Sequence, residues 1–309
     1  MEDEIDAEDE AAQNQMPRGS DRICCIAATE SDRECPTPDN RMFESEFTLQ
    51  QISELEVEGD DSPCAYLPQQ TSTMTYRVAR TLTAERYESL LERGWRRFGR
   101  TLFRPVCRGC QSCQPLRVEI GAFSPSKSQR RCSKRIAARG DFEIDVQMPR
   151  VTEEHIQLYD EYHADMNARK GWAWQPMTPE DYHSGFIAGE FPFARQFEYR
   201  LNSSLVGVGL VDVTPNVMSS IYFYFSPELR AEGFGTWSIL QELSHGSANG
   251  QKWLYLGYFI RDCSSMNYKN RFRPCQVLDA FVDDSEPPHW RSMTEMETKK
   301  GRGSDLSPA

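Results

Sequence analysis

The chain of 309 residues lacks the long apolar runs that a membrane-spanning protein needs. A transmembrane helix takes about 20 consecutive apolar residues, and no segment approaches that length. The N-terminus is acidic and has neither the basic region nor the apolar stretch of a secretory signal. The sequence therefore predicts a soluble, cytoplasmic protein with no membrane partner.

The residue patterns of several enzyme classes are also missing. We find no paired carboxylates of the kind used in acid–base hydrolysis, and no nucleophile triad. No internal repeat is visible, and the length allows one large domain or two ordinary ones. Nothing in the sequence therefore supports a hydrolase with such machinery.

Charge is distributed very unevenly along the chain. Residues 1–62 hold 19 Asp and Glu against 4 Arg, whereas residues 93–139 hold 13 Lys and Arg and a single acid, Glu119. Blocks of like charge without apolar periodicity are usually disordered, so residues 1–61 are expected to form a disordered extension of unassigned role. The basic segment is typical of a surface that binds nucleic-acid phosphates, and we favour RNA over DNA. An acidic protein partner, or the chain's own acidic extension, is the alternative.

Cysteine is present at ten positions, which in an intracellular protein argues against a disulfide framework. Cys107, Cys110 and Cys113 are regularly spaced, and Cys64 is a candidate fourth ligand. Four thiolates suit structural zinc or an iron–sulfur cluster. The alternative is a set of reduced thiols that bind nothing.

The order of predicted elements indicates a mixed α/β sheet. Strands are expected at 95–103, 116–120, 197–201, 205–213, 219–225 and 253–258, and helices at 83–94, 125–139, 152–169 and 236–248. The strand–strand–strand–helix–strand order of the second half favours an α/β fold. We divide the chain into the extension 1–61, a small basic Cys-containing domain 62–140, a larger C-terminal domain 141–282 and a disordered tail 283–309.

A glycine-containing loop connects the predicted strand 219–225 to the helix that follows. Arg230, Gly233 and Gly235 have the spacing R-x-x-G-x-G, which resembles the pyrophosphate loop of the GNAT acyltransferase superfamily. Backbone N–H groups at a helix N-terminus attract anions. A tight turn without a ligand is the alternative.

The stretch from Tyr255 to Pro274 mixes three tyrosines with several cationic side chains. Such a mixture can stack on flat rings and bind phosphates or carboxylates. Tyr258, Tyr268 and Lys269 are the candidates for contact with substrate. Asp212 is a lone acid in an apolar strand: it is either a solvent-facing residue or a carboxylate near the reaction centre.

Several motifs together resemble the arginyl-tRNA–protein transferase family, and most closely its bacterial aspartate/glutamate leucyltransferase branch. The resemblance covers roughly residues 62–280 and does not include the acidic extension. The motifs are Cys64-Ala-Tyr-Leu-Pro68, Tyr87-x7-Trp95-Arg-Arg97-x-Gly99, Arg104-Pro105-x-Cys107-x2-Cys110-x2-Cys113-x-Pro115-x-Arg117, Ser124-Pro-Ser-Lys-Ser-Gln-Arg-Arg131, Tyr222-Phe-Tyr-Phe-Ser-Pro227 and Tyr255-Leu-Gly-Tyr258-x4-Cys263-x2-Met266-x-Tyr268-Lys269-x2-Phe272-x-Pro274.

The resemblance implies a GNAT-like domain that moves an amino acid from charged tRNA onto the N-terminal amine of a protein beginning with Asp or Glu. The cysteine spacing favours leucine over arginine as the transferred residue. An aminoacyl ester is already activated, so no cofactor is required, and no ATP motif is visible. Iron–sulfur or zinc at the cysteines remains a separate prediction.

The predicted site residues fall into three groups. Expected catalytic residues are Asp212, Tyr222, Tyr258 and Lys269. Expected tRNA-binding residues are Arg96, Arg97, Arg117, Lys127, Arg130, Arg131, Arg230, Gly233 and Gly235. Arg261 and Tyr268 are expected to bind the N-terminus of the acceptor protein.

Two other functions fit parts of the sequence. One is a CoA-dependent N-acetyltransferase with the same fold, for which acetyl-CoA and not charged tRNA would stabilise the protein. The other is a non-catalytic RNA-binding protein with a zinc module, which would bind tRNA without transferring anything. The basic segment and the requirement for an acidic substrate together favour the transferase over both.

Overall fold

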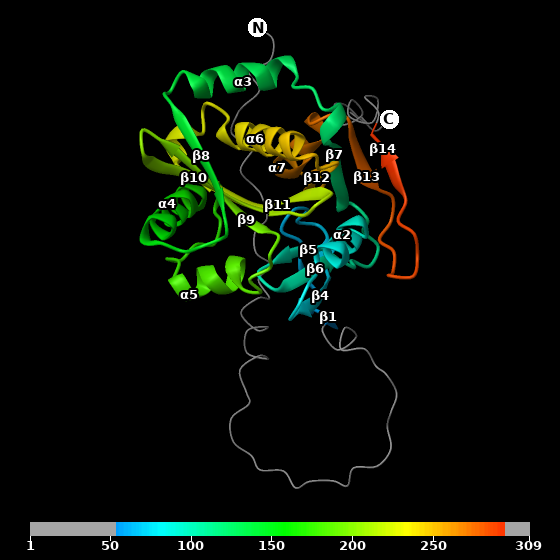
Figure 1. Ribbon diagram of the computed structural model, residues 1–309. Coiled ribbons are helices and arrows are strands. Elements are labelled where there is room, and N and C mark those ends of the chain that lie inside the picture. Colours follow the sequence, from blue (N-terminus) through cyan, green and yellow to red (C-terminus); the bar gives the residue numbers. More distant parts are fainter. Residues whose placement is uncertain (1–53, 294–309) are drawn as a thin grey trace, which may run out of the picture.

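The computed structural model describes residues 54–293, which fold into two larger sheets with helices around them (Figure 1). The first sheet has the strand order β1 (Glu54–Glu58), β4 (Met74–Ala79), β6 (Thr101–Pro105) and β5 (Arg96–Phe98). The short strands β2 (Ser62–Pro63) and β3 (Thr71–Ser72) pair separately. Strand β1 lies inside the segment 1–61 that we predicted to be disordered, and the rest of that prediction, up to residue 53, lies outside the described residues.

Helix α2 (Ala84–Glu92) covers this sheet and matches the predicted helix closely. The Thr83 hydroxyl accepts a hydrogen bond from the backbone N–H of Arg86, and Leu90 and Leu91 are buried. The predicted strand 95–103 is instead two strands, β5 and β6, which form a hairpin at Gly99. The basic side chains of β5, Arg96 and Arg97, are buried.

The second sheet has eight strands in the order β14-β13-β7-β12-β11-β10-β9-β8. Their bounds are Gln114–Glu119 for β7, Phe142–Gln147 for β8, Ala194–Leu201 for β9, Ser204–Val213 for β10, Val217–Phe225 for β11, Trp253–Phe259 for β12, Cys275–Leu278 for β13 and Trp290–Ser292 for β14. The predicted strands 197–201 and 205–213 are confirmed as β9 and β10, which form a hairpin across residues 202–204. Strands β11 and β12 are parallel and are connected through a long helix. The predicted mixed α/β sheet is confirmed.

The two long helices lie on opposite faces of this sheet. Helix α4 (Glu153–Lys170) begins at the N-cap Thr152, and its aromatic and histidine side chains contact Tyr222 and Tyr224 of β11. Helix α6 (Phe234–Asn249) begins after Gly233, and its Phe234 contacts Phe223 of the same strand. Because neighbouring residues of a strand point to opposite faces, α4 and α6 cover opposite faces.

Helix α3 (Lys127–Ala137) packs on α6 at the outside of the molecule (Figure 1). Its first turn is stabilised by a capping box, in which Ser126 and Gln129 bond each other's backbone N–H groups. The shorter helical segments are η3 (Ile120–Ala122), α5 (Pro179–Tyr182), η4 (His183–Ile187), η5 (Pro227–Leu229), α7 (Ser264–Asn267) and η6 (Tyr268–Arg271). None of the described helices combines the length and the apolar character needed to cross a membrane.

Two features differ from the predicted division of the chain. Strand β7, from the predicted domain 62–140, lies between β12 and β13 in the large sheet. Strand β14 and the ion-paired Asp283 and Asp284 belong to the segment 283–309, which we expected to be a disordered tail. Strand pairing and these ion pairs place residues 283–293 in the fold, while residues 294–309 lie outside the described part of the chain.

Candidate active site at the β11/β12 junction

The parallel pairing of β11 with β12 extends over only three residue pairs, from Val217–Trp253 to Ser219–Tyr255. Both strands become irregular at the end of this stretch. The register of β11 with β10 shifts at this level, and that of β12 with β7 shifts between Tyr255 and Gly257. We call the place where the pairing ends, at Ser219, Ser220 and Gly257, the β11/β12 junction.

Arg96 reaches the junction from β5 and is only 3% exposed. Its Nη1 donates to the hydroxyl of Ser219 at 2.8 Å, and its Nη2 donates to the carbonyl of Ser220. Its Nε is buried and has no hydrogen-bond partner among the described residues. Because a buried unpaired donor is costly, this atom is a candidate for binding a ligand. The expected role of Arg96 in binding tRNA phosphates does not fit this burial.

Lys269 lies on η6 beside Arg96 and is 1% exposed. Its Nζ donates to the carbonyl of Tyr258 at 2.9 Å and lies 3.6 Å from the sulfur of Met266. Burial, and next the guanidinium of Arg96, lower the pKa of the Lys269 amine to about 7. The structure thus brings Lys269, a predicted catalytic residue, next to a second buried cation.

Asp212 is not available as a free carboxylate, which corrects its predicted catalytic role. Its two oxygens accept a bidentate pair of bonds from Arg97, of which the Nε–Oδ2 distance is 2.7 Å. Arg97 also donates to the carbonyl of Gly99 at 2.8 Å and packs over the ring of Phe191. Both charged side chains are buried. Arg97 is therefore an internal partner of Asp212 and not a tRNA-binding side chain.

Glu242 is a site residue that our sequence reasoning missed. It lies on α6, is 1% exposed, and its Oε1 accepts a bond of 3.4 Å from the hydroxyl of Ser220. Its Oε2 has no partner among the described residues. Burial raises the pKa of this carboxyl to about 8, although Ser220 and Arg96 lower it. A lone acid within the apolar helix pattern of residues 236–248 was the signal that could have found it.

Tyr258 and Tyr222, the other two predicted catalytic residues, have protein partners. The hydroxyl of Tyr258 donates to the carbonyls of Gly94 at 3.0 Å and Phe103 at 3.3 Å. The hydroxyl of Tyr222 lies 2.7 Å from Nε2 of His163, on the α4 face of the sheet. The other ring nitrogen of His163 is 2.7 Å from the carbonyl of Tyr159, so it donates there and Nε2 accepts from Tyr222. Tyr222 is therefore held on the face opposite Glu242.

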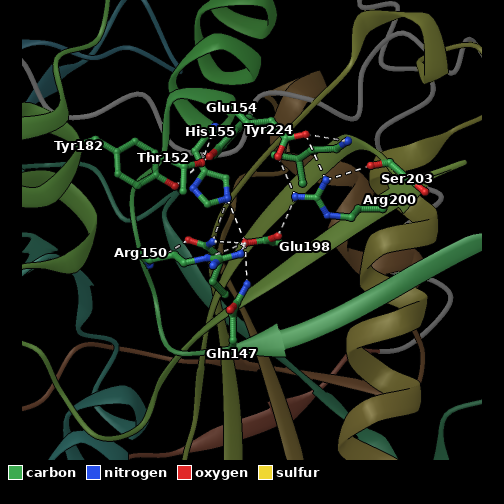
Figure 2. Close-up of polar contacts among 12 residues, drawn as sticks. Gln147, Arg150, Thr152, Glu154, His155, Tyr182, Glu198, Arg200, Ser203 and Tyr224 are labelled. Atoms are coloured by element: carbon green, nitrogen blue, oxygen red, sulfur yellow. Dashed lines mark hydrogen bonds and ion pairs between the residues drawn. The ribbon is translucent and has the colours of Figure 1, made fainter.

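A second buried polar network lies at the β8–β9 edge of the sheet (Figure 2). The Oε1 atom of Glu198 accepts bonds from Gln147 at 2.6 Å and from Arg150 at 3.1 Å, and lies 3.0 Å from Nε2 of His155. Its Oε2 accepts a bond of 3.2 Å from Arg200. Because each oxygen already has a partner, this network connects β8, β9 and α4 and leaves no carboxylate oxygen free for a substrate.

The predicted tRNA-binding residues are scattered by the fold. Lys127, Arg130 and Arg131 are exposed on α3. Arg117 is stacked between Trp253 and Trp290, with its guanidinium carbon 4.1 and 4.2 Å from the two ring centroids. Arg96 and Arg97 lie on β5, as described above, whereas Arg230 and Gly233 lie in the loop before α6 and Gly235 is the second residue of that helix.

That loop differs from the expected phosphate site. Arg230 forms an ion pair with Asp165 and is largely buried. Gly233 and Gly235 are buried, and Cys132 of α3 lies against the loop, its thiol 3.1 Å from the carbonyl of Gly233. Since α3 contacts the start of α6, the glycine amides do not face solvent.

The residues predicted to bind the acceptor N-terminus are also separated. Arg261 is exposed, whereas Tyr268 is buried beside Lys269. Their role in binding the acceptor N-terminus stays a prediction. The cationic side chains that lie close together are Arg96 and Lys269, which are both buried.

The four predicted metal ligands, Cys64, Cys107, Cys110 and Cys113, lie near one another. Cys107 accepts a bond of 3.4 Å from the backbone of Thr73, and burial together with nearby thiols raises the pKa of Cys113 to about 12. Cys107, Cys110 and Cys113 line a cavity of about 340 Å³. Within residues 54–293 no three metal-ligating side chains are arranged to hold an ion. The iron–sulfur or zinc site at these cysteines stays a prediction.

Comparison with known proteins finds family matches for both the N-terminal and the C-terminal part of the chain. Residues 62–131 match the family described as arginine-tRNA-protein transferase, N terminus, and residues 154–279 match its C-terminal counterpart. The aspartate/glutamate leucyltransferase of Helicobacter hepaticus is 39% identical over 227 residues, which are 74% of this chain and 93% of the relative. The enzymes of the same name from Campylobacter jejuni and Pseudomonas fluorescens are 31% and 33% identical, over 71% and 70% of this chain and 90% and 89% of the relatives.

Likeness to solved structures is low. The structure of L-PGS from Bacillus licheniformis has a TM-score of 0.38 at 14% identity over 59% of each chain. FemX has a TM-score of 0.36 at 9% identity over 67% of this chain and 80% of its own. The sequence matches, in contrast, cover both halves of the chain in the expected order, and the chain belongs to the arginine-tRNA-protein transferase family.

Proposed function

We propose that the protein transfers leucine from charged tRNA to the N-terminal amine of proteins that begin with Asp or Glu. The observation that carries this proposal is the match of both transferase family segments, together with relatives named aspartate/glutamate leucyltransferase that align over about nine tenths of their length. Arginine is the alternative donor residue. The product would carry a new N-terminal residue that marks it for degradation.

The chemistry suits a site built from buried cations. The ester of an aminoacyl-tRNA is already activated, so the enzyme must position the amine and stabilise negative charge on the carbonyl oxygen. Arg96 and Lys269 supply donors at the junction, and their hydrogen bonds to described residues go to hydroxyl, carbonyl and thioether groups. Charge stabilisation in a water-poor site is among the strongest contributions that a protein can make to such a reaction.

Helix α3 is the surface that we assign to the tRNA backbone. Its exposed basic side chains are Lys127, Arg130, Arg131, Lys134 and Arg135. Three of these residues belong to our original prediction. Phosphate contacts by such a helix give affinity that falls steeply with salt concentration, without reading the sequence of the RNA.

A transfer assay tests the proposal directly. The full chain is incubated with tRNA charged with radiolabelled leucine or arginine, and with peptides that differ only in the first residue, Asp, Glu, Asn or Ala. We expect label from leucyl-tRNA on the Asp and Glu peptides and little on the other two. Absence of transfer from both charged tRNAs to every peptide would refute the function, and transfer from arginyl-tRNA alone would change the donor.

A further inference from the structure

The exposed face of helix α3 carries a row of cations. The side of the helix that packs on α6 is buried, whereas its basic side chains all face solvent. Residues three or four positions apart are neighbours on a helix surface, so these cations form a single stripe and repel one another. We call it the basic stripe, and its members are Lys127, Arg130, Arg131, Lys134 and Arg135.

The basic stripe has little acidic compensation within the described part of the chain. Helix α3 itself contains no Asp or Glu. Glu232 forms an ion pair of 3.4 Å with Arg139, which follows the helix, and Arg135 donates only to the backbone carbonyl of Glu232. Lys127, Arg131 and Lys134 form no ion pair with a residue between 54 and 293. Repulsion among these like charges is reduced by an anionic partner or by salt.

The sequence of this chain contains an anionic segment of similar length. Residues 2–10 hold seven Asp and Glu and no base, and we call them the acidic block. Residues 11–53 hold seven further acids, but these are mixed with four Arg. The match to the transferase family begins at residue 62, after both segments. The acidic block is therefore the part of the chain whose charge best complements the basic stripe.

The connection between the two is long enough for them to meet. Figure 1 places β1, where the described residues begin, and α3 at opposite ends of the molecule. Residues 11–53 can span at most about 140 Å when fully extended, whereas a folded body of 240 residues is roughly 45 Å across. Attachment to the same chain also raises the local concentration of the block, so that even a weak contact is populated.

We propose that the acidic block, residues 2–10, binds the basic stripe of α3 when no tRNA is bound, and that charged tRNA must displace it. The competition rests on the function proposed above, because it needs tRNA on α3. Exposed ion pairs are individually weak, so the contact is reversible and weakens as salt concentration rises. The affinity for tRNA falls in proportion to the fraction of molecules whose stripe is free.

Cross-linking of the full chain tests the contact. A carbodiimide joins a carboxylate directly to a lysine amine that touches it, and Lys127 and Lys134 lie in the stripe. Lys170, at the end of α4 on the other face of the sheet, and the exposed Lys252 are the controls. We expect cross-links from residues 2–10 to Lys127 and Lys134, which disappear when charged tRNA is added in excess. No cross-link to the stripe, or equal yields at the control lysines, would refute the contact.

Charge neutralisation in the full chain tests the competition. One variant replaces the seven acids of the acidic block by Asn and Gln. Its matched control makes the same replacements, with the same change in net charge, at Asp21, Glu30, Asp32, Glu34, Asp39, Glu44 and Glu46. At low salt we expect the first variant to lower the dissociation constant for charged tRNA about fivefold, which corresponds to a stripe covered for about four fifths of the time. The control should change it less than twofold, and the difference should shrink as salt is raised.

The outcomes separate this contact from the function on which the competition rests. Equal gains in the two neutralised variants would indicate general repulsion between acids and tRNA and would refute the competition. A wild-type chain that binds charged tRNA and transfers leucine, yet gives no cross-link to the stripe, refutes the contact alone. A chain that cross-links as expected but neither binds charged tRNA nor transfers an amino acid refutes the function, and the contact stands.

Discussion

Lys269 illustrates, at the scale of a single residue, how burial changes the chemistry of a common side chain. An exposed lysine is fully charged at neutral pH, whereas the pKa of the Lys269 amine is lowered to about 7. The folded protein therefore binds fewer protons than the unfolded chain between about pH 7 and the usual lysine value of 10.5. Stability contributed by this residue rises with pH across that window and is lowest below pH 7.

This rise of stability with pH leads to a prediction for Lys269→Met. The variant should be more stable than the wild type at pH 6, and its advantage should shrink as pH rises toward 10, because the charge that it removes is costly only where the buried amine is protonated. Urea unfolding at several pH values measures the difference in free energy. An advantage that does not change with pH would contradict the lowered pKa.

Glu242 gives the opposite case. Its carboxyl has a pKa of about 8 in the folded protein against 4.5 as the usual value, so the folded state holds a proton that the unfolded state loses between these values. Its contribution to stability is complete below pH 4.5 and is lost as pH rises through 8.

Glu242→Gln cannot titrate and should gain thermal stability relative to the wild type from pH 5 to pH 8. It should also keep most of the transfer activity, since it retains a neutral polar group beside Ser220. Loss of transfer in a folded Glu242→Gln would show that the charged form is required.

At the scale of elements, local signals in the sequence located the helices α2, α3, α4 and α6 and the strands β5, β6, β7, β9, β10, β11 and β12, whereas β1, β4, β8, β13 and β14 were not predicted. Thr83, the first residue of the predicted helix 83–94, caps α2, and the polar residues 202–204 lie between the predicted strands that form the hairpin of β9 and β10. The sequence of β5 does not show that its arginines point into the protein, because their partners lie far along the chain. Arg97 pairs with Asp212, 115 residues later, and Arg96 with Ser219, 123 residues later. The predicted residues therefore came together in part, and their roles in contacting tRNA did not follow from charge alone.

Helix α3 is the element on which we expect tRNA affinity to depend. Arg131→Glu reverses one exposed charge there and should weaken binding of charged tRNA several-fold at low salt, with a shallower dependence of affinity on salt concentration. Arg80→Glu, at an exposed position after β4, is a control with the same change in charge. Filter binding at several salt concentrations measures both. Equal losses in the two variants would indicate a general charge effect and would remove α3 as the specific surface.

At the scale of the whole molecule, the pair of Arg97 and Asp212 connects the two sheets. Asp212→Asn leaves a buried guanidinium without its carboxylate and should lower the free energy of unfolding by about 3–5 kcal/mol. Replacing both residues in Arg97→Met/Asp212→Leu should restore part of this loss, because an apolar pair leaves no charge uncompensated. Urea unfolding at pH 7 measures each variant. A double variant less stable than Asp212→Asn would contradict this expectation, because the apolar pair would then not compensate for the loss of the ion pair.

The position of β7 has a consequence for how the chain can be divided. This strand comes from the segment that matches the N-terminal family description, yet it pairs with β12 on one side and β13 on the other. A fragment beginning at residue 141 would lack an interior strand of its own sheet and would expose the pairing edge of β12, with the apolar Leu254 and Leu256. Exposed strand edges of this kind recruit other chains and aggregate. The two family segments are therefore halves of one folding unit, which must be made together to remain monodisperse.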